Sequence, residues 1–234
     1  MSSVPARPET VEKGSDPFEA ETVEKGSDPA VAVLISGRGS NLGALIQAIE
    51  RGRLPARIAV VVSNVPDARG LEIARAARVD TLVLPFRGFG SRDAYDDALA
   101  VALQERSVTL VCLAGFMRVL GSAFCGAFPW AILNIHPSLL PSFPGPDAPR
   151  QAVLHGVKVT GATVHFVTPE LDAGPIVLQQ AVPVFGTDTA ESLAARVLAV
   201  EHEIYPEAVR RVLYEPWHID GRRVVFGERA GPLG

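Results

Sequence analysis

Residues 130–141 read Trp-Ala-Ile-Leu-Asn-Ile-His-Pro-Ser-Leu-Leu-Pro, and this stretch indicates the fold class most directly. A near-continuous apolar run is typical of a strand buried in a parallel sheet, so residues 130–135 are predicted to form one. Pro137 and Pro141 prevent regular structure from continuing. Because ligands of open α/β sheets bind at the carboxyl ends of strands, the stretch predicts a functional site where this strand ends.

Asn134 and His136 give that predicted site its chemistry. Two residues apart in a strand, they project from the same face. The amide could stabilise an oxyanion, and the imidazole could move a proton at one carbonyl carbon. Asp172, in the loop 171–175, would favour the imidazolium and orient its ring if it reaches His136. That contact is a hypothesis, and a lone histidine is more often structural than catalytic.

Strands and helices alternate from Ala30 onward, which is typical of βαβ units and a parallel sheet. The predicted strands are residues 30–35, 57–63, 81–84 and 109–114, and the predicted helices are 40–51, 69–78 and 91–106. A short helix or irregular turn over 121–129 precedes the strand at 130–135. A proline-rich loop over 137–149 and a helix near 149–156 follow it.

The carboxyl-terminal part has a different pattern. Residues 157–167 and 175–184 look like two strands that could run antiparallel, joined by the loop 168–174. A long helix is predicted over 188–214, with Thr187, Asp188 or Thr189 as its N-cap. Asp220-Gly221 between extended segments predicts a hairpin within 217–226.

Length and composition favour one large domain with extensions. Of the 234 residues 47% are hydrophobic, which is enough for a full core over residues 30–226. Residues 1–29 repeat ETVEKGSDP and are rich in charge, glycine, serine and proline, so they are predicted to be a disordered acidic tail. A partner-binding arm is the alternative. Residues 227–234 look like a loose end.

The charge distribution argues against nucleic acid as a partner. The tail holds seven acidic and three basic residues, so it accounts for the whole net charge of −4 and the body is close to neutral. A neutral body has no basic footprint for nucleic acid, although a local patch could escape this test.

Several features favour a cytoplasmic location. Cys112 and Cys125 are two lone cysteines in apolar surroundings, which suggests reduced thiols. Neither has further ligands at zinc-like spacing, so no metal site is expected. No stretch is apolar enough for a membrane span, and the amino terminus lacks the pattern of a signal peptide.

The turn after the first predicted strand resembles a phosphate cradle. Its glycines, Gly37 and Gly39, allow close backbone approach, and the helix that follows offers free N–H groups to an anion. The G-x-G-x-x-x-G spacing differs from the dinucleotide pattern, and no carboxylate follows the second strand. A monophosphate is therefore favoured over a dinucleotide. The alternative is a tight turn in which Ser40 caps the helix.

Four other features are weaker candidates on their own. Residues 115–120 could hold a flat ring system, but core packing explains them almost as well. Arg92 could bind an acidic ligand or be solvated. Thr163 and His165 share one face of a strand and could support the site, or His165 could be purely structural. Glu201 and His202 could face solvent without a role.

Together these motifs resemble the phosphoribosylglycinamide formyltransferase family. The segments LISGRGSNL, LAGFMRVL, LNIHPSLLP, HFVTPELDAGP and VEHEIYP occur in the order found in that family, and the likeness covers about residues 31–226. It implies an α/β, three-layer fold with a seven-stranded, mostly parallel sheet and a Rossmann-like amino half. It also implies transfer of formyl from 10-formyltetrahydrofolate to the amine of phosphoribosylglycinamide, without a metal or redox cofactor.

The resemblance also assigns residues. The catalytic trio would be Asn134, His136 and Asp172. The ribonucleotide would be held by Gly37, Arg38, Gly39, Ser40 and Asn41 at its phosphate and by Glu201 at a ribose hydroxyl. The folate pocket would be formed by Arg92, Met117, Arg118, Val119, Leu120, Asn134, Thr168, Pro169, Glu170, Leu171 and Asp172.

One departure from the family pattern lies after Pro144-Gly145, where the family often has a histidine two residues on and this chain has Asp147. This removes any histidine contact there and could alter the rigidity of the loop 144–149. It does not touch the trio.

Three alternatives remain open from the sequence. Methionyl-tRNA formyltransferase shares HPSLLP but needs an additional carboxyl-terminal domain. Formyltetrahydrofolate hydrolase carries a regulatory domain before its core, where this chain has the polar tail. A non-catalytic nucleotide-binding module would not need the trio to converge. The oligomeric state is also open, with a homodimer among the options.

Overall fold

The structure is a computed structural model that describes residues 28–227, so most of the two predicted terminal tails lies outside the described residues. The elements are β1 (Ala30–Ile35), α1 (Ser40–Glu50), β2 (Arg57–Ser63), α2 (Gly70–Ala76), β3 (Thr81–Val83), η1 (Phe86–Gly88), α3 (Arg92–Gln104), β4 (Leu110–Leu113), α4 (Ser122–Ala127), β5 (Ile132–His136), α5 (Ala148–Leu154), β6 (Val159–Phe166), β7 (Ile176–Pro183), α6 (Ala190–Tyr214), β8 (Trp217–Asp220) and β9 (Arg223–Phe226). Every strand and helix predicted from the sequence over these residues is present, with boundaries shifted by a few residues.

The strands form one sheet in the order β3-β2-β1-β4-β5-β6-β7-β9-β8. The half from β3 to β5 is parallel throughout, as its βαβ pattern predicts. The sheet has nine strands within the described residues, so the expected count of seven is wrong. The difference is the hairpin β8–β9, which extends the sheet beyond β7 through the single register position Ile176↔Arg223.

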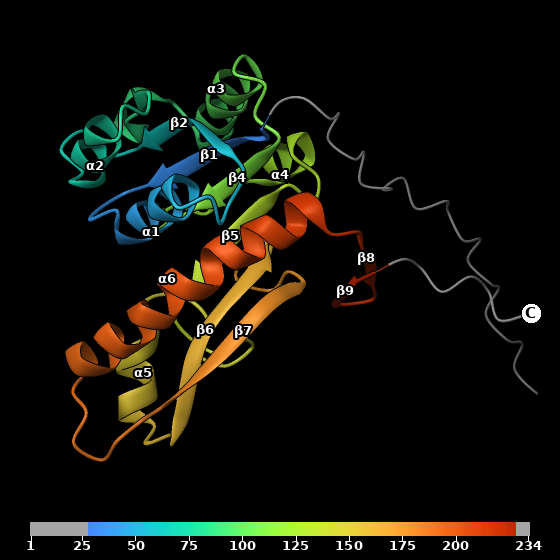
Figure 1. Cartoon of the computed structure of the whole chain (residues 1–234). Coiled ribbons are helices and arrows are strands. Elements are labelled where there is room, and N and C mark those ends of the chain that lie inside the picture. The colour runs from blue at the N-terminus through green and yellow to red at the C-terminus, as the bar shows by residue number, and fades with distance from the viewer. Residues whose placement is uncertain (1–27, 228–234) are drawn as a thin grey trace, which may run out of the picture.

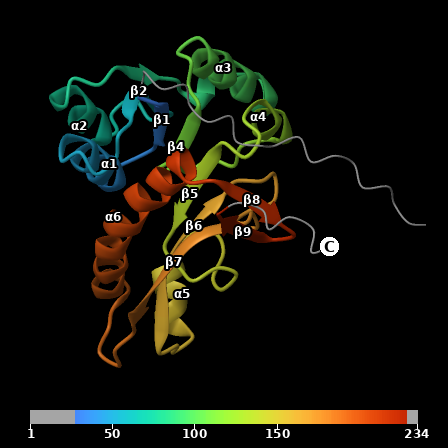
Figure 2. The ribbon, with the colours of Figure 1, turned by 45° about the vertical axis from the view of Figure 1, so that its right-hand side comes forward.

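Helices cover both faces of the sheet and make three layers. One apolar core lies under α1, α2, α5 and α6, and a second lies under α3 and α4 on the opposite face. The strand β1 runs between the two cores, and each of its six residues is buried, which explains its unbroken apolar sequence. Figure 1 shows α6 lying diagonally across the sheet, and Figures 1 and 2 both place the hairpin β8–β9 at the end away from α2.

The strands β5, β6 and β7 pair antiparallel, which confirms the orientation suggested for the last two. The register of β5 and β6 sets Asn134 opposite His165 and His136 opposite Thr163. Residues two apart in a strand share a face, so these four polar side chains lie on one face of the sheet. The intervening residues Leu133 and Ile135 belong to the core under α6 on the other face.

The long helix α6 is tied to the centre of the sheet by a buried tyrosine. Its N-cap is Thr189, which forms a capping box with Ser192. Tyr205 is fully buried, and its hydroxyl lies 2.9 Å from the carbonyl oxygen of Leu113 in β4 and 3.1 Å from that of Leu133 in β5. Burial raises the pKa of the Tyr205 phenol well above its ordinary value, so it acts as a donor to these two strands.

Among residues 28–227 no helix combines the length and apolar character that crossing a membrane requires. Both cysteines are free, Cys112 fully buried and Cys125 partly exposed. Burial raises the pKa of the Cys112 thiol to about 12.

Replacing the Tyr205 hydroxyl should destabilise the fold measurably. We expect Tyr205→Phe to lower the free energy of unfolding by about 1–3 kcal/mol, because two carbonyl groups at the centre of the sheet lose their buried donor. Urea denaturation followed by circular dichroism measures this. Tyr214→Phe is the matched control. Tyr214 lies at the exposed end of the same helix, and its hydroxyl donates to the carbonyl oxygen of Pro55. An equal loss in both variants would contradict the role of Tyr205.

Candidate active site

Asp172 joins the two histidines of the β5–β6 pair. Its Oδ2 lies 3.5 Å from Nδ1 of His136, and its Oδ1 lies 3.7 Å from Nε2 of His165. The backbone N–H of Gly145 donates to Oδ2 at 2.8 Å. The structure therefore contains the contact between Asp172 and His136 that the sequence left as a hypothesis. Asp172 also has a positive φ of 49°, which turns the loop 168–174 towards the sheet.

His165 orients the amide of Asn134. Burial lowers the pKa of His165, so its ring is neutral at physiological pH. Its Nδ1 lies 2.8 Å from the carbonyl oxygen of Phe166 and must carry the proton, because a carbonyl can only accept. Its Nε2 is then the acceptor for Nδ2 of Asn134 at 3.2 Å. One hydrogen of the Asn134 amide is fixed in this way, and the other is left for a ligand.

His136 has acceptors on both sides of its ring. Its Nε2 lies 2.9 Å from the carbonyl oxygen of Phe143, and its Nδ1 faces the carboxylate of Asp172. A carbonyl can only accept, so Nε2 carries a proton in this contact, and Nδ1 faces a carboxylate that can accept from it. The side chain is buried.

Thr163 supports the site without reaching it. Its hydroxyl donates to the carbonyl oxygen of Ser138 at 2.6 Å and accepts from the N–H of Leu140 at 3.0 Å. Gln179 of β7 donates to the same hydroxyl at 2.9 Å and to the carbonyl oxygen of Leu140 at 2.8 Å. These bonds fix the loop that follows His136 against β6 and β7.

A small cavity opens beside this cluster. Its enclosed part measures about 90 Å³, and its walls are Leu113, Phe116, Arg118, Val119, Leu120, Asn134, His165, Val167, Thr168, Glu170, Leu171 and Asp172. Most of the predicted folate residues are in this set. The cavity is smaller than the 300–1,000 Å³ or so that is usual for a ligand of folate size. A ligand of that size must extend out of it or displace one of its walls.

Three predicted folate residues are not part of these walls. Met117 is 76% exposed beside them, and Pro169 belongs to the loop but does not line the cavity. Arg92, at the start of α3, lies beside Gly121 and Asp96 rather than in the cavity, with its Nε 3.6 Å from a Cβ built on Gly121.

Asp96 is a residue that the sequence reasoning missed. It is almost completely buried, and its Oδ2 accepts from the N–H of Gly121 at 2.6 Å. Burial raises the pKa of this carboxyl, partly offset by the Gly121 bond and the nearby Arg92 and Arg118 guanidinium groups. All of residues 116–120 except Met117 line the cavity, and they are called the wall segment 116–120 below. The bond to Gly121 fixes the carboxyl end of this segment. The sequence pattern that could have revealed Asp96 is an acidic residue on the apolar face of α3, four residues before the buried Ala100.

Ser36 was also missed as a site residue, although it begins the glycine turn. Its hydroxyl donates to Oδ1 of Asn64 at 2.5 Å and accepts from the N–H of Met117 at 2.8 Å. Its own N–H donates to the carbonyl oxygen of Gly115 at 3.1 Å. Ser36 therefore joins the turns that follow β1, β2 and β4 into one surface.

The glycine turn leaves the amino end of α1 free for an anion. The N-cap is Gly39 in the left-handed conformation with φ 75°, and no side chain caps the helix, so the alternative of a Ser40 cap is wrong. A Cβ on Gly39 would lie 2.5 Å from Cα of Gly70, which explains the glycine. Uncapped N–H groups together with the helix dipole favour a phosphate here.

Glu201 reaches this turn from α6. It is buried, so the alternative that it faces solvent without a role is wrong. Nδ2 of Asn41 donates to its Oε2 at 2.7 Å, and Glu201 as a whole residue is 6% exposed. Burial raises the pKa of Glu201, against the smaller lowering effects of the Asn41 bond and the Arg38 guanidinium. A carboxylate beside the free helix end is well placed to accept hydroxyl groups of a sugar phosphate.

Asp147 is the N-cap of α5, in the left-handed conformation with φ 57°, and its side chain makes no capping bond. The loop is held instead by two hydrogen bonds. Nε2 of Gln151 donates to the carbonyl oxygen of Pro146 at 2.9 Å, and the N–H of Gly145 donates to the carboxylate of Asp172. The family departure at this position therefore leaves the trio intact. Within the part of the chain that the structure describes, no group of His, Cys, Asp and Glu could hold a metal ion.

Comparison with known proteins agrees with this geometry. The formyl transferase family profile matches residues 30–209. The chain is 45% identical to phosphoribosylglycinamide formyltransferase of Escherichia coli over 211 residues, which cover 87% of this chain and 97% of that protein. The crystal structure of glycinamide ribonucleotide transformylase 1 from Symbiobacterium toebii superposes with a TM-score of 0.85 at 53% identity, covering 87% of this chain and 96% of that one.

A larger relative contains the same domain as one of its parts. The chain is 49% identical over 182 residues to the trifunctional purine biosynthetic protein adenosine-3 of Gallus gallus. The match takes in 78% of this chain but only 18% of that protein. The family profile covers most of the described residues and the full-length bacterial relative aligns along nearly its whole length, and this chain therefore belongs to the formyl transferase family.

Proposed function

We propose that this protein transfers the formyl group of 10-formyltetrahydrofolate to the amine of phosphoribosylglycinamide, a step of de novo purine synthesis. The observation that carries the proposal is the convergence of Asn134, His136 and Asp172 through His165 at one end of β5. Nδ2 of Asn134 lies 3.2 Å and Oδ1 of Asp172 lies 3.7 Å from Nε2 of His165, and a non-catalytic nucleotide-binding module would not need these side chains to converge.

The ribonucleotide would lie along the carboxyl ends of β1 and β4. The proposed cradle for its phosphate is the turn Gly37 to Asn41, whose N–H groups lie at the free end of α1. Glu201 would accept a ribose hydroxyl from the other side. This is the crevice where the strand order reverses between β1 and β4, the usual ligand site of such sheets.

The folate would enter the cavity between the wall segment 116–120 and the loop 168–172 with its reactive end. The rest of it would extend along the mouth, where Met117, Val119 and Leu171 expose apolar side chains. Arg92 would contribute only if the ligand extends beyond the enclosed part of the cavity. Formyl-folate is a co-substrate that is consumed. The proposed mechanism uses no resident metal or redox group.

The proposed mechanism follows from the charges. The substrate amine attacks the formyl carbon, and negative charge develops on the formyl oxygen. The free hydrogen of the Asn134 amide and an N–H of His136 would donate to that oxygen. The attacking nitrogen loses a proton, the folate nitrogen gains one, and the bond between that nitrogen and the formyl carbon breaks. In this proposal Asp172 would favour the imidazolium form of His136 and would position a water that carries the proton.

His136 must exchange one partner for this to happen. Its Nε2 donates to the carbonyl of Phe143 in the ligand-free structure. We infer that substrate binding replaces this carbonyl with the formyl oxygen, since catalytic hydrogen bonds are often completed only when the substrate is present. The carbonyl of Phe143 would then be the resting acceptor that keeps the proton on the ring.

A coupled assay tests the proposal directly. Purified protein is mixed with phosphoribosylglycinamide and 10-formyltetrahydrofolate, and the appearance of deformylated folate is followed. Loss of formyl only when the ribonucleotide is present supports the transferase. Equal loss without the ribonucleotide would identify a hydrolase instead, and no loss in either case would contradict both.

The trio should be essential for turnover. We expect Asn134→Ala or His136→Ala to lower kcat about 100-fold or more, because each removes one donor to the developing oxyanion. His218→Ala is the matched control, since His218 lies on β8 at the edge of the sheet and does not line the cavity. Steady-state kinetics of the three purified variants measures this. Near-normal kcat in His136→Ala would refute the assigned role.

Glu201 should control binding of the ribonucleotide and its dependence on pH. We expect Glu201→Ala to raise the KM for phosphoribosylglycinamide about tenfold, because a charged acceptor is lost. In the wild type this KM should rise as the pH falls through the raised pKa of Glu201, where the carboxylate becomes protonated. Glu201→Gln is neutral throughout and should lack this component, while titration of the substrate phosphate affects both proteins alike. The same pH profile in both would contradict the prediction.

We also infer a cytoplasmic protein that acts on small molecules. Two free cysteines, one of them deeply buried with a strongly raised thiol pKa, are compatible with a reducing compartment. The near-neutral body favours small substrates over nucleic acid.

A further inference from the structure

The loop 168–174, which carries Asp172, is held from two opposite sides. On the side of His136, the N–H of Gly145 donates to the carboxylate of Asp172 at 2.8 Å. On the other side, Nη2 of Arg222 donates to the carbonyl oxygen of Ala173 at 3.0 Å. Ala173 follows Asp172 directly, so the second bond fixes the Ala173–Gly174 peptide group, one residue beyond the residue with the positive φ.

Arg222 stands at the turn of the β8–β9 hairpin, where Gly221 has a φ of 61°. The base of the hairpin is firmly attached to the body. Trp217 packs on Phe166 with 4.9 Å between ring centroids, and its Nε1 donates to the carbonyl oxygen of Val212 at 3.0 Å. Arg211 of α6 lies 3.8 Å from the ring centroid of Phe226. The hairpin is therefore fixed at the end that joins α6.

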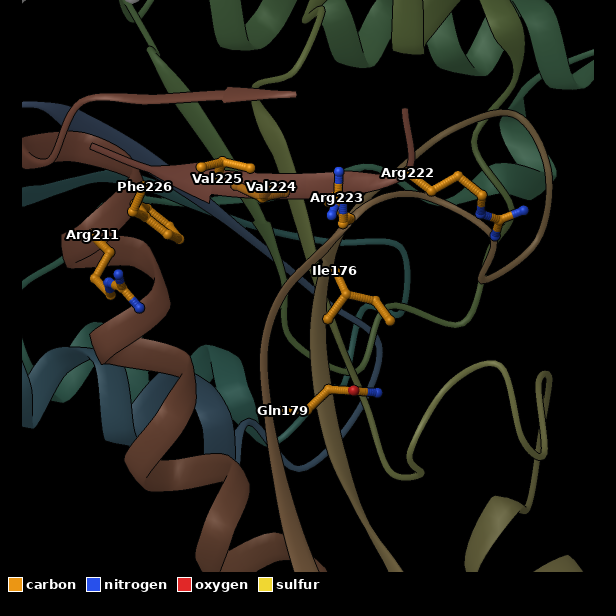
Figure 3. A pocket seen from close by; sticks show the side chains of 8 residues that line it. All are labelled: Ile176, Gln179, Arg211, Arg222, Arg223, Val224, Val225 and Phe226. Carbon is orange, nitrogen blue, oxygen red and sulfur yellow. The ribbon is translucent and has the colours of Figure 1, made fainter. Parts of the chain in front are cut away.

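The tip of the hairpin is attached to the sheet much more sparsely. The strand β9 meets β7 at one register position, and a groove of about 580 Å³ lies beside it, lined by Ile176, Gln179, Arg211, Arg222, Arg223, Val224, Val225 and Phe226. Figure 3 shows Arg211 and Phe226 at one end of this groove and Arg222 at the other, with its guanidinium extended away from them. The tip is therefore joined to β7 by the pairing of Arg223 with Ile176, and to the loop 168–174 by the bond from Arg222 to Ala173.

We propose that Arg222 is a positioning residue for the formyl-transfer site, which acts through Ala173 to hold Asp172 and the folate wall 168–172 in place. The inference rests on the proposed function. Its physical basis is that the loop must stay ordered at Asp172 while its outer part, Leu171 and Glu170, gives way to a ligand larger than the enclosed cavity. A long arginine side chain can keep its bond to a carbonyl through such a shift.

The neighbouring Arg223 provides a matched control. It carries the same charge at the same turn, but its guanidinium pairs with Asp220 of the hairpin instead of the loop. Arg222→Met and Arg223→Met therefore remove equal charge from the same surface, and only the first removes the bond to Ala173. Arg222→Lys retains a cationic donor that can reach a carbonyl.

The experiment compares steady-state kinetics of the three variants with the wild type. We expect Arg222→Met to raise the KM for 10-formyltetrahydrofolate about threefold and to lower kcat about twofold, as loss of one exposed charged hydrogen bond allows. The KM for phosphoribosylglycinamide should change less than about twofold, since its proposed cradle is formed by other segments. Arg222→Lys should recover much of the loss, and Arg223→Met should match the wild type.

Amide hydrogen exchange on the same proteins separates positioning from a general loss of stability. Amides of residues 170–174 should exchange faster in Arg222→Met, while the thermal midpoint and exchange in β1 and β4 stay as in Arg223→Met. Wild-type kinetics in Arg222→Met, or equal losses in both variants, would overturn the inference while leaving the proposed function standing. An inactive wild type would instead remove the proposed function.

Discussion

The carboxylate of Asp172 lies between two histidine rings, and the arrangement of the site depends on this one set of contacts. On one side it faces Nδ1 of His136, and on the other it approaches His165, whose pKa is lowered by burial. The neutral His165 in turn fixes the amide of Asn134. A continuous set of contacts thereby holds His136, Asp172, His165 and Asn134 in one cluster.

The two halves of the sheet contribute different parts of the candidate site. The parallel half brings together the turns after β1, β2 and β4, which Ser36 links into a surface suited to a sugar phosphate. The antiparallel half, β5 to β7, supplies polar side chains on one face and a loop long enough to cover them. In the proposed function both substrates would meet at the end of β5, the strand that belongs to both halves.

Much of the fold could be predicted because its signals are local. The apolar runs of β1 and β5, the helical periodicity between them and the Asp220-Gly221 hairpin all depend on residues close together in the chain. The nine-stranded sheet could not be counted in advance, because attachment of the hairpin to β7 depends on one pairing between Ile176 and Arg223. Asp96 was missed because its partner Gly121 is 25 positions away.

The sequence by itself determined the α/β class and the glycine turn, since these follow from periodicity and motif, and its resemblance to a known family assigned the residues for formyl transfer. Only the tertiary structure decided which groups meet. It joined Asn41 to Glu201 across 160 positions and placed Arg222 against the loop of Asp172. It also set the protonation of His165 through burial. Contacts and burial of this kind depend on how distant segments pack, which no local pattern in the chain encodes.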